Sequence, residues 1–153
     1  MRCIHTADWH LGNRMHEIDR SREQDFFLGW LRDEIVRVQA DCLIVAGDVY
    51  DVANPPNEAK KAYCAFLASL VGTCCRNVII VGGNHDSGSL LDTEADILAA
   101  LNIHVVGSLA NRKPADLVFE LQDGAGEAIG IAAAVPYARE IELRPYAGGE
   151  GGG

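Results

Sequence analysis

Residues 42–51 read CLIVAGDVYD, a continuous apolar run that ends in a glycine and two aspartates. Two further short runs, at residues 1–6 and 78–81, have the same character and also lead into aspartate, histidine or glycine. Short runs rich in Ile and Val are typical of strands buried in a parallel sheet. The predicted fold is therefore built around three such strands.

The segments between these strands are long enough for crossover helices. Apolar residues recur every three or four positions in residues 19–39, 58–71 and 90–101, which is the periodicity of amphipathic helices. Ser21 followed by Gln24 has the pattern of a capping box at the start of the first helix. With a fourth strand at residues 103–106, this alternation predicts an α/β fold with a parallel sheet and right-handed crossovers.

The character of the chain changes after Gly107. Two apolar segments, residues 117–121 and 129–135, flank a turn rich in Gly and Asp and predict a β-hairpin. We expect residues 1–145 to belong to one domain. The glycine-rich residues 146–153 are expected to form a disordered tail.

Composition narrows the class of protein. The 153 residues carry a formal net charge of −9, which argues against a simple nucleic-acid-binding module because such modules are basic. It argues less against a metalloenzyme, in which bound cations supply positive charge. Five cysteines without a C-x-x-C pair predict reduced thiols. No run is apolar enough to span a membrane or to serve as a signal peptide, so we expect a cytoplasmic location and no membrane partner.

Polar side chains follow the three strands where each strand ends. Ligands bind beyond the carboxyl ends of the strands in such sheets, so these side chains should meet at one edge. Carboxylate, imidazole and carboxamide groups form a mixed donor set that suits Mn²⁺, Fe²⁺ or Zn²⁺. A carboxylate from the middle strand, Asp48, could bridge two ions about 3.5–4 Å apart. The gathered residues are Asp8, His10, Asp48, Asp51, Asn84, His85 and Asp86.

His85 and Asp51 are candidates for a different task. His85 directly follows Asn84, so its side chain should project differently and is better placed to act on a substrate than to share the ion. Asp51 could hold the imidazole of His85 in one tautomer, as carboxylates behind catalytic histidines do.

Each cluster also has a purely structural interpretation. Asp8 could form an Asx-turn after its strand, Asp48 and Asp51 could cap the following segment, and residues 82–84 could be a simple turn. Three successive strand ends with the same ligand chemistry nevertheless favour a metal site.

The clusters resemble those of the calcineurin-like metallophosphoesterases, which contain Asp-x-His, Gly-Asp-x-x-Asp and Gly-Asn-His-Asp in this order. Longer matches at residues 5–12, 44–51, 55–56 and 83–87 resemble the SbcD-type nuclease branch of that family, over about residues 1–145. Ala7 departs from the branch, which commonly has Ser there. The resemblance implies a β-sheet sandwich flanked by helices, of which this chain is the N-terminal half.

The resemblance also implies a metal-dependent activity. Asp8 and His10 would bind a first ion, Asn84 a second, and Asp48 would bridge the two. Members of the branch cleave DNA phosphodiesters with two divalent ions, most often Mn²⁺, in double-strand-break repair and recombination. They pair with an SbcC-type coiled-coil ATPase.

In the same way the resemblance implies that His85 stabilises or protonates the leaving oxygen and that Asp51 orients it. Three arginines border the predicted site and are candidate DNA contacts, although they could equally be solvated surface charges. They are Arg14, Arg20 and Arg22.

The family pattern continues with further ligand histidines that this chain lacks. Its other histidines are His5 and His104, expected in the core of their strands, and His16, expected in a polar loop. The chain would thus supply three ligands to the first ion and two to the second, where about six are needed and water makes up the deficit. We expect the second site to be poor.

Three functions remain open on these grounds. The first is an SbcD-type phosphodiesterase acting on DNA, and the second is a phosphoesterase acting on a small nucleotide, which the acidic charge favours. The third is a catalytically incompetent half-domain. The helical faces at residues 58–71 and 90–101 could also pair with a second copy to form a homodimer.

Overall fold

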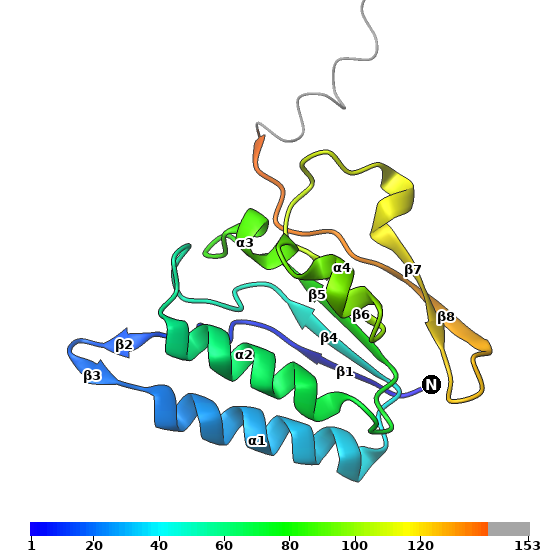
Figure 1. The fold of residues 1–153 in the computed structure, drawn as a ribbon, viewed down its shortest axis with the longest axis horizontal. Coiled ribbons are helices and arrows are strands. Elements are labelled where there is room, and N and C mark those ends of the chain that lie inside the picture. Colours follow the sequence, from blue (N-terminus) through cyan, green and yellow to red (C-terminus); the bar gives the residue numbers. More distant parts are fainter. Residues whose placement is uncertain (141–153) are drawn as a thin grey trace, which may run out of the picture.

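A computed structural model describes residues 1–140. Its centre is a four-stranded parallel sheet with the order β1-β4-β5-β6 (Figure 1). The strands are β1 (Cys3–Thr6), β4 (Cys42–Ala46), β5 (Asn77–Val81) and β6 (Ile103–Val106). All four predicted strands are therefore present, with boundaries that shift by no more than two residues. The predicted burial of the first strand is wrong, because β1 lies at the edge of the sheet and none of its residues is buried.

Parallel pairing brings the carboxyl ends of β1, β4 and β5 to one edge of the sheet. Thr6 pairs with Val45, and Val45 pairs with Ile80, so the three strands finish within a residue or two of one another. The pairing continues past the strand ends, because the amide of Leu11 donates to the carbonyl of Val49 at 2.9 Å. The first two loops are thus joined by backbone hydrogen bonds.

Two helices cover one face of the sheet (Figure 1). They are α1 (Ser21–Val38) and α2 (Asn57–Leu70), and both lie within two residues of their predicted bounds. Their apolar stripes pack with β4 and β5 into the main core, in which Ile35 and Leu67 are almost completely buried. Burial of such side chains contributes about 1.5–3 kcal/mol each to stability.

An antiparallel hairpin, β7 (Val118–Gln122) and β8 (Ala128–Ala133), packs on the opposite face and confirms the predicted hairpin. A short 3₁₀ helix, η1 (Pro114–Leu117), precedes it. The buried Asn77 side chain joins the two sheets, because its Nδ2 donates to the carbonyl of Gln122 and its Oδ1 accepts from the Gln122 amide, both at 2.8 Å. The chain therefore has sheets and helices arranged as a layered sandwich.

The hairpin covers only part of that face. One row of paired residues crosses the sheet, namely His5, Ile44, Ile79 and His104. At one end of the row His104 stacks on Phe119 of the hairpin, with ring centroids 4.4 Å apart. At the other end His5 is exposed, so its predicted place in the core is wrong.

The predicted single helix over residues 90–101 is also wrong. The segment forms two short helices, α3 (Gly88–Asp92) and α4 (Ala95–Ala99), and Leu101 is 48% exposed. At the end of α3 the Asp92 carboxylate accepts hydrogen bonds from the Gly107 amide at 2.7 Å and from Arg112 at 2.8 Å. These contacts fix the end of α3 against the loop after β6.

Two other features differ from the prediction. A small ribbon, β2 (Arg14–Met15) with β3 (Ile18–Asp19), precedes α1 and was not anticipated. The N-cap of α1 is Arg20, without a side-chain cap, so the predicted Ser21–Gln24 capping box is absent. The predicted disordered tail, residues 146–153, lies outside the described residues. No helix within residues 1–140 is both long and apolar enough to cross a bilayer.

Candidate metal centre

Three loops at the carboxyl ends of β1, β4 and β5 carry the predicted ligand residues. Their backbone is unusual, because Asp8, His10 and Asp48 have φ values of 57°, 46° and 50°. Residues other than glycine rarely adopt this left-handed region, and those that do cluster at functional sites. Backbone bonds hold the conformation: the amide of Asp8 donates to the Gly47 carbonyl at 3.1 Å, and that of His10 to the Asp48 carbonyl at 3.0 Å.

The first ligand group consists of Asp8, His10 and Asp48, whose donor atoms all lie within 4.8 Å of one another. The Nε2 atom of His10 lies 3.8 Å from Asp8 Oδ1 and 3.9 Å from Asp48 Oδ2. Two atoms that each bind one ion at about 2.1 Å are at most about 4.2 Å apart. The spacing therefore fits a divalent cation between them. The Asp8 side chain is 72% exposed, so solvent can supply the missing ligands.

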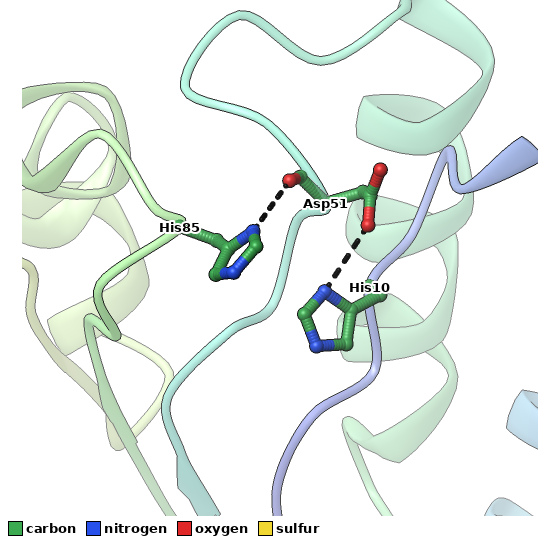
Figure 2. A group of neighbouring side chains, drawn as sticks. All are labelled: His10, Asp51 and His85. Carbon is green, nitrogen blue, oxygen red and sulfur yellow. Dashed lines mark hydrogen bonds and ion pairs between the residues drawn. The ribbon is translucent and has the colours of Figure 1, made fainter.

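The second ligand group consists of His10, Asp51 and His85, one from each loop (Figure 2). Asp51 lies between the two histidines, with its Oδ1 atom 3.2 Å from Nδ1 of His10. The two imidazole rings meet edge to face with centroids 5.0 Å apart. Three carboxylates, those of Asp8, Asp48 and Asp51, thus surround His10, and this concentration of negative charge favours a bound cation.

His85 is held through the backbone of Asp51. Its Nδ1 atom lies 2.9 Å from the carbonyl oxygen of Asp51, and a carbonyl only accepts, so Nδ1 carries the hydrogen. This hydrogen bond, together with the charges of Asp48, Asp51 and Asp86, raises the pKa of His85 above its usual value despite some loss of hydration. The Nε2 atom is left as the reactive nitrogen.

The comparison with known proteins agrees with this geometry. A family model for calcineurin-like phosphoesterases matches residues 1–127. The chain belongs to the calcineurin-like phosphoesterase family. Within it, the chain is 36% identical over 143 residues to the SbcD subunit of the nuclease SbcCD from Escherichia coli K12, a match that covers 94% of this chain and 34% of the relative.

Two further relatives of this chain are also SbcD subunits of SbcCD nucleases. The protein from Rhodobacter capsulatus is 36% identical over 149 residues, covering 94% of this chain and 36% of the relative. That from Bacillus subtilis is 34% identical over 107 residues, covering 70% of this chain and 27% of the relative. The chain therefore spans about a third of the length of the curated relatives it matches.

Glycine permits the close approach of the loops that follow β4 and β5. A Cβ atom at Gly83 would overlap both the carboxylate and the amide nitrogen of Asp48. The backbone of His85 contacts the same side chain, since its amide donates to Asp48 Oδ1 at 3.0 Å. Asp48 is consequently only 8% exposed. Its side chain is held by the loop after β5 as well as by the loop after β4, to which it belongs. Asn84 lies in that loop and is exposed.

Asp86, gathered with the ligands by the sequence, instead joins two loops. It is 1% exposed, and its carboxylate accepts from the amides of Val49 at 3.1 Å, Tyr50 at 2.9 Å and Gly83 at 2.8 Å. All four lone-pair directions of a carboxylate can accept, so one side chain satisfies three amides. Asp86 therefore fixes the loops that present Asp48 and His85.

Two residues that the sequence did not reveal support His10 and Asp51. The Nε2 atom of Gln24 in α1 donates to the His10 carbonyl at 2.9 Å, and its Oε1 accepts from the Gly12 amide at 3.1 Å. Asn13 donates to Asp51 Oδ1 at 2.8 Å. Neither contact follows from a local pattern, because each joins positions more than ten residues apart.

The three candidate arginines have different surroundings. Arg20 lines a cavity beside Asp8 and His10. Arg14 is exposed, and its Nη2 donates to the carbonyl of Glu17 at 3.0 Å. Arg22 is exposed in the first turn of α1 and does not line that cavity. Of the three, Arg20 is therefore the arginine that borders the ligand groups.

Proposed function

We propose that this chain is the ion-binding part of an SbcD-type nuclease that hydrolyses DNA phosphodiesters with two divalent ions, preferably Mn²⁺. The observation that carries the proposal is the ligand group of Asp8, His10 and Asp48, with His85 beside it, in a member of the calcineurin-like phosphoesterase family. The names of the relatives supply the nuclease class. By the same analogy the partners are DNA and an SbcC-type ATPase, and the process is double-strand-break repair and recombination.

The donor set divides between the two ions. Asp8 and His10 would hold the first ion, Asp48 would reach both, and the exposed Asn84 would contribute to the second. Bound ions of this kind neutralise phosphate charge and lower the pKa of a coordinated water. Imidazole and carboxylate donors together suit Mn²⁺ better than Ca²⁺. Asp51 would orient His10 through its carboxylate, as carboxylates behind metal-bound histidines do.

His85 would serve as the proton donor to the leaving oxygen. Because the Nδ1 hydrogen already donates to the Asp51 carbonyl, Nε2 is the ring nitrogen that remains available to a substrate. A raised pKa keeps this imidazole protonated closer to neutral pH, as a general acid requires. His85 is exposed, so a phosphodiester can reach it.

The direct test uses bis(p-nitrophenyl) phosphate with Mn²⁺. We expect the chain to hydrolyse this reporter, and His85→Ala to lower kcat about 10²–10⁴-fold, the range for loss of a general acid. Calorimetry should find the Mn²⁺ affinity of this variant largely unchanged. His5→Ala is the matched control, since His5 is an exposed histidine of β1 that belongs to neither ligand group. Parallel loss of ion binding and activity in His85→Ala would contradict the assigned role.

A small nucleotide is the second candidate substrate. The net charge of −9 favours it, because a long polyanion is repelled by an acidic surface. Competition between a duplex oligonucleotide and a cyclic mononucleotide in one Mn²⁺ assay separates the two classes. A cytoplasmic location belongs to the same proposal and is supported by the five free cysteines.

A further inference from the structure

A cavity of about 480 Å³ adjoins the first ligand group. Asp8, His10 and Asp51 form its wall on the ligand side. The first two turns of α1 form the opposite wall, where Arg20, Glu23 and Phe27 line it. Its volume is within the range of small-molecule sites, which hold about 300–1,000 Å³. A substrate whose phosphate lay at the ligand group would extend into this space.

Aromatic rings form the apolar part of the cavity. Phe27 is half-buried and lines the cavity together with Trp9. The two rings meet edge to face with centroids 6.2 Å apart, and Trp30 stacks on Phe27 at the same distance. Phe66 of α2 fixes Trp9 from behind, at 5.2 Å. The rings are therefore held in place before any ligand binds, which suits a stacking surface.

The polar groups of the cavity are mostly committed to the protein. The side-chain amide of Gln24 donates through Nε2 and accepts through Oε1 from the backbone of the first loop, and Asn13 donates to Asp51. Arg20, by contrast, is exposed and makes no side-chain hydrogen bond or ion pair within residues 1–140. It stands at the N-cap of the 18-residue helix α1, where the helix dipole adds positive potential. Glu23, in the first turn of α1, also lines the cavity, and its negative charge would repel a phosphate placed beside it.

We propose that this cavity holds the nucleobase next to the phosphate at the ligand groups, stacked against Phe27, while Arg20 binds the neighbouring phosphate. The inference rests on the proposed phosphodiesterase function and names a subsite for its substrate. Because the amides of Gln24 and Asn13 are already bonded, the base is bound by stacking and not by reading its edge. The subsite should therefore accept all four bases.

The test compares two probes that differ only in the base, deoxyadenosine 5′-monophosphate and 1,2-dideoxyribose 5-phosphate, which carries hydrogen in place of the base, with Mn²⁺ present. Calorimetry should show the nucleotide binding about ten-fold more tightly, the scale of one stacked base. The chain has two tryptophans, and Trp9 and Trp30 both contact Phe27, so the nucleotide alone should also quench their fluorescence.

Neighbouring phenylalanines provide matched variants. Phe27→Leu keeps apolar volume but removes the ring, and it should bring the ratio of the two affinities close to one. Phe26 is 79% exposed and does not line the cavity, so Phe26→Leu should leave the ratio unchanged. Arg20→Ala should weaken a 5′-phosphorylated dinucleotide several-fold relative to the mononucleotide, whereas Arg32→Ala, on the same helix, should not.

Equal affinity for the two probes, no binding of either, or the same effect of Phe26→Leu and Phe27→Leu would overturn the inference. The reporter used above has no base, which separates this failure from failure of the proposed function. Reporter hydrolysis without discrimination between the probes would remove the base subsite alone. Discrimination without hydrolysis would keep the subsite and remove the phosphodiesterase.

Discussion

The backbone carbonyl of Asp51, and not its carboxylate, holds the imidazole of His85, 2.9 Å from Nδ1. The carboxylate faces His10 instead, with 3.2 Å between Oδ1 and Nδ1. The sequence assigned the carboxylate to His85. The carbonyl and the carboxylate of Asp51 thus contact two different histidines. Substitution of the Asp51 side chain should therefore disturb His10 and leave the contact with His85 in place.

Asp51→Asn should consequently weaken ion binding more than proton transfer. The carbonyl that holds His85 is retained, while His10 loses its charged neighbour. Loss of such a supporting carboxylate typically lowers metal affinity about 10–100-fold. Titration of reporter hydrolysis with Mn²⁺ measures the shift, and Asp33→Asn, at an exposed position of α1, is the control. A lower kcat with an unchanged Mn²⁺ requirement would assign Asp51 to His85 after all.

Asp86→Asn should destabilise the fold. The carboxylate accepts from three backbone amides, and an Asn of the same shape leaves at least one of them facing an NH₂ group. A buried amide without an acceptor costs about 1–3 kcal/mol. Urea denaturation should show this loss, whereas Asp123→Asn should be nearly neutral, because Oδ1 alone accepts both turn amides there. Equal stabilities of the two variants would contradict the structural role of Asp86.

Gly83→Ala should displace Asp48 from the ligand group. The new methyl group would overlap the carboxylate and the backbone of Asp48, and overpacking against backbone costs about 1–3 kcal/mol. We expect a lower melting temperature and a lower Mn²⁺ affinity. Gly124→Ala is the control, since a Cβ there meets nothing within 4 Å. Normal ion binding in Gly83→Ala would show that the loops separate more easily than their contacts suggest.

His104 should make stability depend on pH. Burial lowers its pKa in the folded chain below the ordinary value of about 6.5. As pH falls through 6.5, His104 binds a proton in the unfolded chain but not in the folded chain. The free energy of unfolding therefore decreases until the folded-state pKa is reached.

His104→Phe keeps a ring against Phe119 and should remove this part of the pH dependence, which begins as pH falls below about 7. His5→Phe provides the comparison, because His5 belongs to the same row of the sheet but is exposed. Melting temperatures of both variants and the parent over this range give the answer. An unaltered slope in His104→Phe would mean that other groups cause the acid sensitivity.

The sequence predicted most of the sheet and the gathering of the ligand residues, for one physical reason. Continuous β-branched runs specify buried parallel strands, and parallel strands finish at a common edge, so residues such as Asp8, Asp48 and His85 must come close together. The division of residues 90–101 into two helices was not predicted, and the hydrogen bond from the Gly107 amide to Asp92 at the end of α3 joins positions that no local pattern connects. Helical periodicity contains no information about such a partner.

The supporting residues were missed for the same reason. Gln24, Asn13 and Asp86 act through bonds to backbone or side chains far away in the sequence, and such bonds produce no periodic pattern. Asp86 was grouped with the ligands only because it is a carboxylate in the right loop. Its three hydrogen bonds from backbone amides, which distinguish it from the candidate ligands, are a property of the folded chain.

The backbone bonds between the first two loops constrain how this region can vary. Backbone hydrogen bonds fix the register of residues 8–11 against residues 47–51. A residue inserted into or deleted from residues 8–11 would therefore shift the rest of that loop out of register. The β2–β3 ribbon, by contrast, is exposed and pairs only with itself. Among homologous chains, length differences should therefore accumulate in residues 14–19 and be excluded from residues 8–11.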